Sequence, residues 1–350
     1  MYVQKFHWMK PLIVRKILLL FKMKLATLPP QPPSRSRNGI LVVVNRSLTQ
    51  AATVEGVPTM QYAIENWATT AVQLQAAFDQ LQAGTHPNAI PFDVTACLAP
   101  FPRAYQFLDG SVYLHHMKKA RAARGVEMPP RYETEPLMYQ GMSHRFLAPT
   151  EPLRVPDDGL NVDFEGEIAI VTDDVPMGTR RADASGHIKL LVLLNDFTLR
   201  VKTKLELPKQ FGFLQAKPIN ALSPVAITPN ELGDKWDGSM PNINVTSSIN
   251  GAWFGSPNAA TDYWFDYPTL IEHAAVSRDL EAGTLIGAGT VSNASAESGY
   301  GSISEATTDQ KLSGEPLTPF LKYGDVVRVE VLDNDQQSLF GAIETKIVHL

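Results

Sequence analysis

Three acidic side chains alternate with other residues at the start of the segment Val162–Val171. Asp163, Glu165 and Glu167 lead into a β-branched run, which predicts a strand with all three on one face. Like charges on one face repel unless a cation or an array of donors lies among them. A solvated edge strand kept soluble by its acids fits the same pattern. Gly166 favours a binding site, because a glycine inside a strand often marks the close approach of a ligand or another backbone.

A further acidic residue, Asp196, follows the apolar run Leu190–Leu194. It could supply another oxygen ligand at the end of a strand, or form a surface ion pair with Arg200, four residues on. Glu165, Glu167 and Asp196 together make an oxygen-only ligand set. Such a set suits Mg²⁺, Mn²⁺ or Ca²⁺ rather than zinc or copper.

Two of the eight histidines, His115 and His116, are adjacent, and Asp109 lies seven residues before the second. The chain then continues into the basic segment Met117–Arg124, which we expect to be helical. A histidine that acts as a general base needs a carboxylate to fix its tautomer and stabilise its cation. The sequence alone leaves open which carboxylate does this.

Several familiar catalytic motifs are excluded. The segment Ile286–Ser292 has two glycines but lacks the third glycine and the following helix of a dinucleotide loop. There is no GxxxxGK[ST], HExxH or GxSxG motif. Cys97 is the single cysteine, which excludes an intramolecular disulfide and a multi-cysteine metal site, and its apolar neighbours predict a buried structural thiol.

The composition is that of a folded protein without a strongly charged partner. The 350 residues carry 31 basic and 36 acidic side chains, a net charge of −5, and 44% of them are hydrophobic. This is too apolar for a disordered chain, and the lack of a basic stripe argues against nucleic acid as a partner. No apolar run reaches the roughly 20 residues that span a bilayer, so we expect no membrane partner. A single cysteine fits a cytoplasmic location.

Residues 1–22 are basic around the short apolar stretch Ile17–Phe21 and contain no acidic side chain. A secretory signal has an uninterrupted core of about 7–15 apolar residues and a small-residue cleavage site, and this segment has neither. We expect an extension that is disordered or lies upstream of a natural start at Met23. A signal or membrane-surface segment is the alternative.

The elements that would position these groups are mostly short strands. Ile40–Val44 is β-branched, and Val326–Val331 alternates with period two, as half-buried strands do. Apolar residues at helical spacing predict a helix over 60–81 and another at Thr269–Leu280. We expect a β-rich α+β fold with a helical N-terminal piece.

Seven short motifs, in order along the chain, resemble those of a known family. They are DGSVYLHH (109–116), PLMYQG (136–141), DFEGE (163–167), NDFTLR (195–200), QAKP (215–218), GAGTVS (287–292) and FGAIE (340–344). Over residues 100–350 the chain resembles the fumarylacetoacetate hydrolase family, and the part from Met23 resembles the smaller first domain of its longer bacterial members. The resemblance implies a small N-terminal α/β domain (23–100), a catalytic domain (101–350) built as a mixed β-roll of highly curved sheet, and a homodimer.

The resemblance also implies a role for each matching site residue. The implied metal ligands are Asp109, Glu165, Glu167 and Asp196, and the implied ion is Mg²⁺ or Ca²⁺, with Mn²⁺ also possible. The implied base is His116, oriented by Glu305, while Lys217 and Arg200 match cations that bind substrate and stabilise negative charge. The implied substrate contacts are Tyr139, Thr203, Gly289 and Thr290.

The reaction implied by the resemblance is metal-dependent hydrolysis of a carbon–carbon bond in a β-diketone acid. The expected substrate is fumarylacetoacetate, cleaved to fumarate and acetoacetate in tyrosine degradation. The same scaffold supports acylpyruvases and oxaloacetate-type decarboxylases or isomerases, and a non-catalytic dicarboxylate binder is a further alternative. A histidine–glutamate pair favours hydrolysis, because water needs a base. Val201, where the family often has aspartate, and Thr203, where eukaryotic members have glutamine, leave the substrate open.

Overall fold

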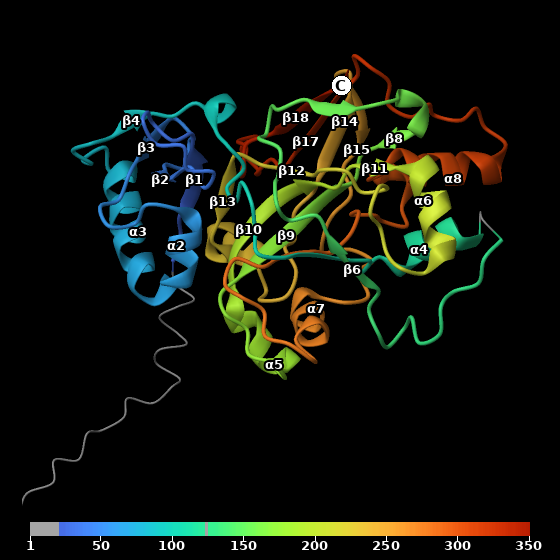
Figure 1. The fold of residues 1–350 in the computed structure, drawn as a ribbon, viewed down its shortest axis with the longest axis horizontal. Coiled ribbons are helices and arrows are strands. Elements are labelled where there is room, and N and C mark those ends of the chain that lie inside the picture. The colour runs from blue at the N-terminus through green and yellow to red at the C-terminus, as the bar shows by residue number, and fades with distance from the viewer. Residues whose placement is uncertain (1–20, 123–124) are drawn as a thin grey trace, which may run out of the picture.

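An open, curved sheet of 11 strands runs through the molecule (Figure 1). The computed structural model describes residues 21–122 and 125–350, so nearly all of the predicted extension 1–22 lies outside the described residues. The strand order is β4-β3-β2-β1-β13-β10-β9-β16-β5-β6, and β12 pairs with β10. The strands are β1 (Lys24–Leu28), β2 (Ile40–Val44), β3 (Gln50–Ala52), β4 (Ile90–Pro91), β5 (Phe107–Gly110), β6 (Met138–Gly141), β9 (Gly166–Thr172), β10 (Ile188–Asn195), β12 (Ala221–Leu222), β13 (Val225–Ile227) and β16 (Leu285–Gly287).

Two smaller sheets complete the strand-rich architecture. A five-stranded sheet has the order β15-β14-β17-β18-β7, and β8 and β11 form a separate pair. Their bounds are β7 (Leu153–Val155), β8 (Val162–Asp163), β11 (Thr198–Leu199), β14 (Thr246–Ile249), β15 (Ala252–Gly255), β17 (Val326–Glu330) and β18 (Ile343–His349). The predicted β-rich fold with curved mixed sheets and an N-terminal unit is confirmed.

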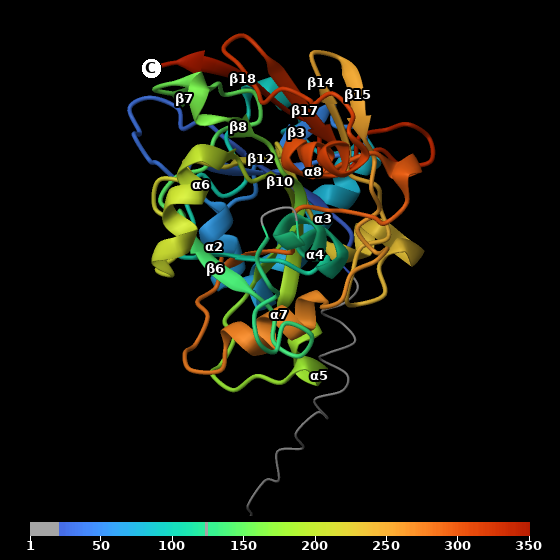
Figure 2. The ribbon, with the colours of Figure 1, turned by 90° about the vertical axis from the view of Figure 1, so that its right-hand side faces the viewer.

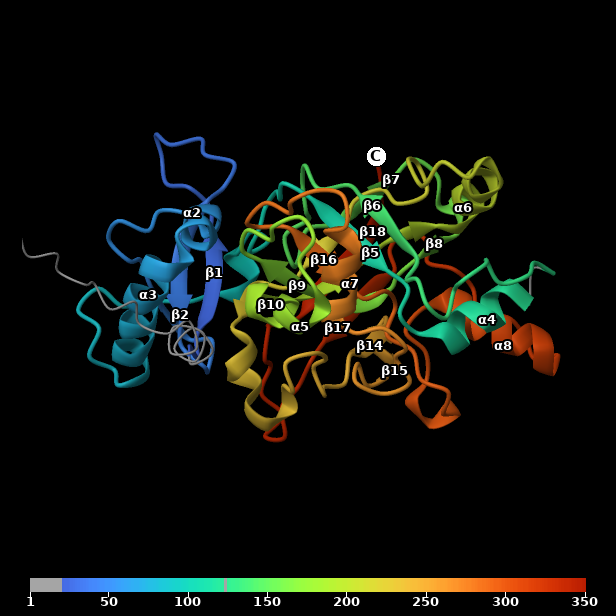
Figure 3. The ribbon, with the colours of Figure 1, turned by 90° about the horizontal axis from the view of Figure 1, so that it is seen from below.

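The helices lie around these sheets. They are α2 (Met60–Glu65), α3 (Trp67–Gln82), α4 (Leu114–Ala122), α5 (Arg181–Ala184), α6 (Arg200–Glu206), α7 (Tyr267–Ala274) and α8 (Ile303–Ser313). Figures 2 and 3 show α4 and α8 side by side at the end of the molecule opposite the N-terminal unit. Within the described residues, none of the helices has the length and apolar character needed to cross a membrane.

The N-terminal unit packs α2 and α3 against its strands. The helix predicted over 60–81 is divided at Asn66, whose side-chain amide donates to the carbonyl of Tyr62 and so competes with the helical backbone. Beyond the break, Trp67, Leu74 and Phe78 are buried in one apolar cluster with the strands. The unit shares the large sheet with the rest of the chain, because β1 pairs with β13.

Four neighbouring strands at the centre of the large sheet, β10, β9, β16 and β5, bring the predicted site residues together. Asp109 on β5 pairs with Gly287 on β16, and Glu167 on β9 pairs with Leu194 on β10. Asp196 follows β10 directly. The three acidic residues therefore lie at neighbouring strand ends on one side of the sheet, although 87 positions separate the first from the last.

The acidic segment 163–167 does not form the single strand that its alternation predicts. β8 ends at Asp163, and β9 begins at Gly166. The amide of Gly166 donates to the carbonyl of Gly301, and a Cβ on Gly166 would lie 3.1 Å from a methyl group of Val245. Gly166 thus marks the close approach of other parts of the chain. This is one of the two alternatives that its position in the sequence suggested, the other being the approach of a ligand.

The second predicted helix is shorter than expected. Helix α7 begins after Asp266, whose carboxylate accepts from the amide of Thr269, and it ends at Ala274 rather than near Leu280. Leu280 instead exchanges backbone hydrogen bonds with Val175, so tertiary pairing overrides the helical pattern there.

Candidate metal centre and active site

Three buried carboxylates converge at the edge of the central sheet. Asp109, Glu167 and Asp196 each offer an oxygen, and these oxygens lie within 4.8 Å of one another. All three side chains are at most 4% exposed. Both oxygens of Glu167 and Oδ1 of Asp196 have no hydrogen-bond partner among the described residues. Buried anionic oxygens without donors are costly, so this group fits a bound cation.

Electrostatics point the same way. Burial, followed by the charge of Asp196, raises the pKa of Asp109 well above its ordinary value. Burial and the charges of Asp109 and Asp196 likewise raise the pKa of Glu167. Oxygen-only ligands of this charge suit a hard divalent cation such as Mg²⁺, Ca²⁺ or Mn²⁺, which would relieve the repulsion among them.

Two glycines contact the carboxylates, one by leaving space for them and one through its backbone amide. A Cβ on Gly287 would lie 2.3 Å from Oδ1 of Asp109 and 3.0 Å from Oε2 of Glu167. Gly289 has a φ of +87°, and its amide donates to Oδ1 of Asp109 over 3.1 Å. Gly289 was a predicted site residue, whereas the role of Gly287 was missed, because its contacts come from two other strands.

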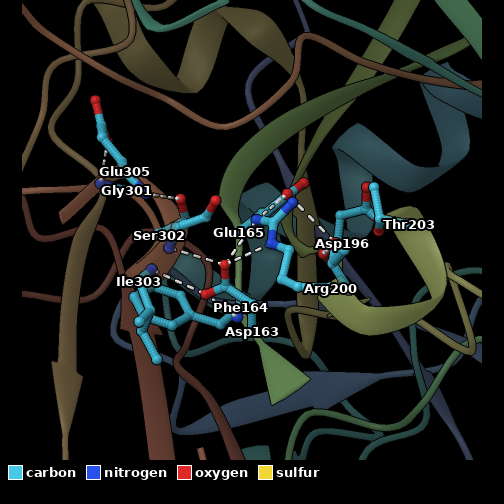
Figure 4. Close-up of polar contacts among 12 residues, drawn as sticks. Asp163, Phe164, Glu165, Asp196, Arg200, Thr203, Gly301, Ser302, Ile303 and Glu305 are labelled. Atoms are coloured by element: carbon cyan, nitrogen blue, oxygen red, sulfur yellow. Dashed lines mark hydrogen bonds and ion pairs between the residues drawn. The ribbon is translucent and has the colours of Figure 1, made fainter. Parts of the chain in front are cut away.

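Glu165, the fourth predicted metal ligand, lies beside this trio and is held by two cations. Its Oε1 is 2.6 Å from the guanidinium of Arg200 (Figure 4). Its Oε2 is 2.8 Å from Nζ of Lys217. Burial alone would raise the pKa of Glu165, but Lys217 and Arg200 together hold it at about 2. Its role as a metal ligand stays a prediction.

Asp163 has a role that the strand pattern did not reveal. Its Oδ2 accepts from Nε of Arg200 over 2.7 Å, and its Oδ1 accepts from the amide of Ile303 (Figure 4). Its Oδ2 also accepts from the amide of Ser304, the next residue in the first turn of α8. The carboxylate therefore fixes Arg200 and the start of α8 together, where it also complements the positive end of the helix. A sequence signal for this helix start existed in Ser302 and Glu305, which have the spacing of a capping box.

Lys217 and Tyr139, both predicted site residues, converge on Asp196. The ammonium of Lys217 forms an ion pair with Oδ2 of Asp196, and the Tyr139 hydroxyl donates to the same oxygen over 2.7 Å. Burial lowers the pKa of Lys217, but the charges of Asp196 and Glu165 outweigh it and raise the pKa above the ordinary value. Lys217 is therefore a permanent cation beside the carboxylates.

Glu206 positions the loop that carries Lys217, and sequence reasoning missed it. Its carboxylate accepts hydrogen bonds from the amides of Leu214, Gln215 and Ala216, at 2.8–3.1 Å. Three amides from consecutive residues converging on one carboxylate fix the loop immediately before the lysine. The signal would have been an acidic residue at the end of α6, where a negative charge is unfavourable for the helix.

His116 and Glu305, the predicted base and the acid predicted to orient it, lie within ion-pair distance. Nδ1 of His116 is 3.5 Å from Oε1 of Glu305. Oε2 of Glu305 accepts from the amide of Gly301 over 3.0 Å (Figure 4). Burial would lower the pKa of His116, but the hydrogen bond and charge of Glu305 raise it. Glu165 and Arg200 also act on this pKa, so the pair faces the charged site.

The remaining predicted residues are placed less directly. Thr290 is buried next to Gly301. The hydroxyl of Thr203 donates to the carbonyl of Leu199, the residue before its helix, at 3.3 Å, and no hydrogen bond joins it to a carboxylate among the described residues. Cys97 is buried, as predicted.

The family follows from the comparison of the whole chain with known families. Residues 106–348 match the family described as "Fumarylacetoacetate (FAA) hydrolase C-terminal", and residues 23–103 match "Fumarylacetoacetase N-terminal domain 2". The chain belongs to the fumarylacetoacetate hydrolase family. This confirms the resemblance found in the motifs.

One curated relative of the chain is a mitochondrial oxaloacetate tautomerase of Xenopus laevis. The two are 24% identical over 217 residues, which is 61% of this chain and 58% of the relative. The chain therefore matches less than two thirds of that protein's length.

Two solved structures illustrate the fold of fumarylacetoacetate hydrolase relatives. A putative HpcE protein from Mycobacterium smegmatis is similar with a TM-score of 0.63 at 17% identity, over 93% of this chain and 99% of that one. Maleylpyruvate hydrolase from Sphingobium sp. SYK-6, in complex with manganese(II) and pyruvate, is similar with a TM-score of 0.60 at 17% identity, over 93% and 99%. At these identities the likeness shows the fold alone.

Proposed function

We propose that this protein is a divalent-cation-dependent hydrolase that cleaves a carbon–carbon bond of a β-diketone acid, with fumarylacetoacetate as its substrate. The observation that carries the proposal is the His116–Glu305 pair beside a buried group of three carboxylates. A base that can activate water is needed for hydrolysis, whereas simple decarboxylation needs none.

Asp109, Glu167 and Asp196 would hold the cation, with Glu165 as a fourth ligand. When bound, a Mg²⁺, Ca²⁺ or Mn²⁺ ion supplies a Lewis acid that polarises the substrate's carbonyl oxygens and stabilises enolate charge. The unpartnered oxygens of Glu167 and Asp196 support this assignment.

His116 would take a proton from the water that attacks one carbonyl carbon. Oε1 of Glu305 lies 3.5 Å from Nδ1 of His116, so Glu305 would hold the proton on Nδ1, leave Nε2 as the basic nitrogen and stabilise the imidazolium that forms. The carbon–carbon bond then breaks with its electron pair going to the departing carbon, and the imidazolium returns the proton there. General-base catalysis of this kind contributes about 10²–10⁴-fold.

The two cations and the substrate-facing groups complete the site. Lys217 and Arg200 would stabilise the oxyanion formed when water adds, because both are fixed by buried carboxylates before substrate arrives. Tyr139, Gly289 and Thr290 would contact the substrate, and Thr203 would do so only after its hydroxyl leaves the carbonyl of Leu199.

A second candidate is oxaloacetate tautomerisation, favoured by the name of the Xenopus laevis relative. Moving a proton between carbon and oxygen of a keto acid needs the same cation and a proton carrier, but no water. His116 would serve as that carrier.

The test is an absorbance assay of the purified protein with fumarylacetoacetate, acetylpyruvate and the enol of oxaloacetate, with Mg²⁺ and after EDTA. Metal-dependent release of fumarate, lost in His116→Ala, supports the proposal. Loss of the enol at constant total oxaloacetate, without cleavage of the other two, identifies the tautomerase instead. Metal binding without turnover would make the protein a dicarboxylate binder.

The proposal also covers the domain organisation, the assembly and the location of the protein. Residues 23–100 would form a domain of their own within the shared sheet, and two chains would assemble as a homodimer. The reaction would take place in the cytoplasm, in tyrosine degradation.

A further inference from the structure

A chain of hydrogen bonds leads from Oε1 of Glu305, the oxygen that Gly301 does not contact, through Ser292 to His115. The hydroxyl of Ser292 donates to Oε1 of Glu305, and Nε2 of His115 lies 2.9 Å from the oxygen of that hydroxyl. Ser292 is 1% exposed. The oxygen that Ser292 binds is the one that faces His116, so both neighbouring histidines of α4 approach the same carboxylate, one directly and one through a serine.

The direction of these hydrogen bonds follows from the charge of Glu305. Burial would raise the pKa of Glu305, but His116 and Ser292 hold it below the ordinary value, so the side chain is a carboxylate that only accepts. The Ser292 hydroxyl must then donate to it and has only lone pairs left for His115. His115 therefore donates from Nε2, and its Nδ1 is unprotonated.

The remaining contacts of His115 agree with this neutral tautomer. Burial lowers the pKa of His115 below its ordinary value. Its Nδ1 is buried and has no hydrogen-bond partner among the described residues. The charged and titratable groups around the two histidines are Glu305, Asp262, Lys119, Glu165 and Arg200, and His116 also lowers the pKa of His115.

The carboxylate of Glu305 is thus held at both oxygens without help from His116, by Gly301 on one side and Ser292 on the other. We propose that Ser292 and His115 are positioning residues for the His116–Glu305 pair, fixing the carboxylate so that it presents Oε1 to Nδ1 of His116. This inference rests on the proposed role of His116 as the base.

The alternative is that these contacts only hold α4 and α8 together. An ion pair between Nζ of Lys119 and Oδ2 of Asp309, 3.0 Å apart, already joins the two helices. Removing that ion pair with Asp309→Asn loosens the same two helices without touching Glu305, and so provides a matched control.

The experiment compares Ser292→Ala, Ser292→Thr, His115→Leu, His115→Gln and Asp309→Asn in the full chain with Mg²⁺. Loss of one hydrogen bond to a charged group should lower kcat in Ser292→Ala about tenfold, with little change in KM. Oε1 would then serve His116 alone, so the acidic limb of the kcat/KM profile should move to higher pH. Threonine keeps the hydroxyl and should restore most of kcat. Glutamine keeps an N–H donor at position 115, so His115→Gln should exceed His115→Leu in activity.

A second readout does not depend on turnover. The His116 titration and the His115 tautomer, followed by NMR of ¹⁵N-labelled imidazoles, should change in Ser292→Ala and remain as in the wild type in Asp309→Asn. If kcat and the His116 titration are unchanged in Ser292→Ala, or if Asp309→Asn reproduces the change, the positioning role is wrong. If the wild type turns over no β-diketone acid, the proposed function fails, while the NMR comparison still decides whether Ser292 sets the state of His116.

Discussion

Gly287 and Asp109 are paired across β16 and β5 so closely that a Cβ on the glycine would lie 2.3 Å from Oδ1 of the aspartate. The same Cβ would lie 3.0 Å from Oε2 of Glu167. Because Gly287 has no side chain, the carboxylates of Asp109 and Glu167 can occupy the space beside it.

We expect Gly287→Ala to weaken binding of Mg²⁺ or Mn²⁺ about 10–100-fold, because the methyl group displaces two ligand carboxylates. Isothermal titration calorimetry measures the change. Gly186→Ala is the control, since a Cβ there meets nothing within 4 Å. Equal affinities in the two variants would contradict the assignment of the centre.

The pH profile should report the coupling between His116 and Glu305. A general base must be neutral, so kcat/KM should rise with pH through the pKa of His116, which Glu305 raises. Glu305→Gln removes that charge, so the rising limb should move to lower pH while the maximal rate falls. His116→Ala should lose about 10²–10⁴-fold. His349→Ala, at an exposed position on β18, should leave the profile unchanged. An unmoved limb in Glu305→Gln would show that another group sets it.

Cation binding should stabilise the fold more strongly at higher pH. Because the folded state raises the carboxyl pKa values of Asp109 and Glu167, these groups favour the metal-free fold while protonated and cost stability as pH rises through those pKa values. A cation removes this cost, and it also competes less with protons at high pH. The rise in Tm on adding Mg²⁺ should therefore be larger at pH 8 than at pH 5, as differential scanning fluorimetry would show. In Gly287→Ala the rise should be largely lost at both values, and a larger rise at pH 5 would argue against carboxylate ligands.

Asp163→Asn should destabilise the fold by about 3–5 kcal/mol, because it leaves Arg200 without one of its two buried partners. Urea denaturation followed by circular dichroism gives the difference. The exposed Arg131–Glu135 pair offers the contrast, and Glu135→Gln should change the free energy of unfolding by less than about 1 kcal/mol. Similar losses in both variants would mean that the Asp163 contacts add little.

The sequence predicts the groups of this site better than their partners. Asp109, Glu167 and Asp196 could be proposed as neighbours because each lies on or directly after an apolar strand and matches a family motif. The break between β8 and β9 could not be predicted, because it depends on amides of α8 about 140 residues away. The alternating pattern predicts side-chain faces only if the strand continues. Here the chain leaves the strand after Asp163, whose carboxylate binds the amides at the start of α8.

The sequence also does not show which of the charged groups form ion pairs with one another. Glu165 and Glu167 are both glutamates two positions apart, yet Glu165 is paired with two cations, whereas the oxygens of Glu167 have no hydrogen-bond partner among the described residues. Only the fold determines this, since Lys217 reaches Glu165 across 52 residues on a loop fixed by Glu206. Ser292 ends the motif GAGTVS (287–292), but a serine has no distinctive sequence spacing to the residues that it binds.

Through the pairing of β1 with β13, the N-terminal unit covers one side of β13. Lys24, Leu25 and Ala26 take up the backbone groups of Ile227, Ala226 and Val225, and β13 in turn borders β10, the strand that leads to Asp196. Without residues 23–100, β13 would be an open edge able to recruit a strand from another molecule. The N-terminal unit therefore occupies the free side of β13 and closes it to strand pairing with another molecule, one strand away from the strand that leads to Asp196.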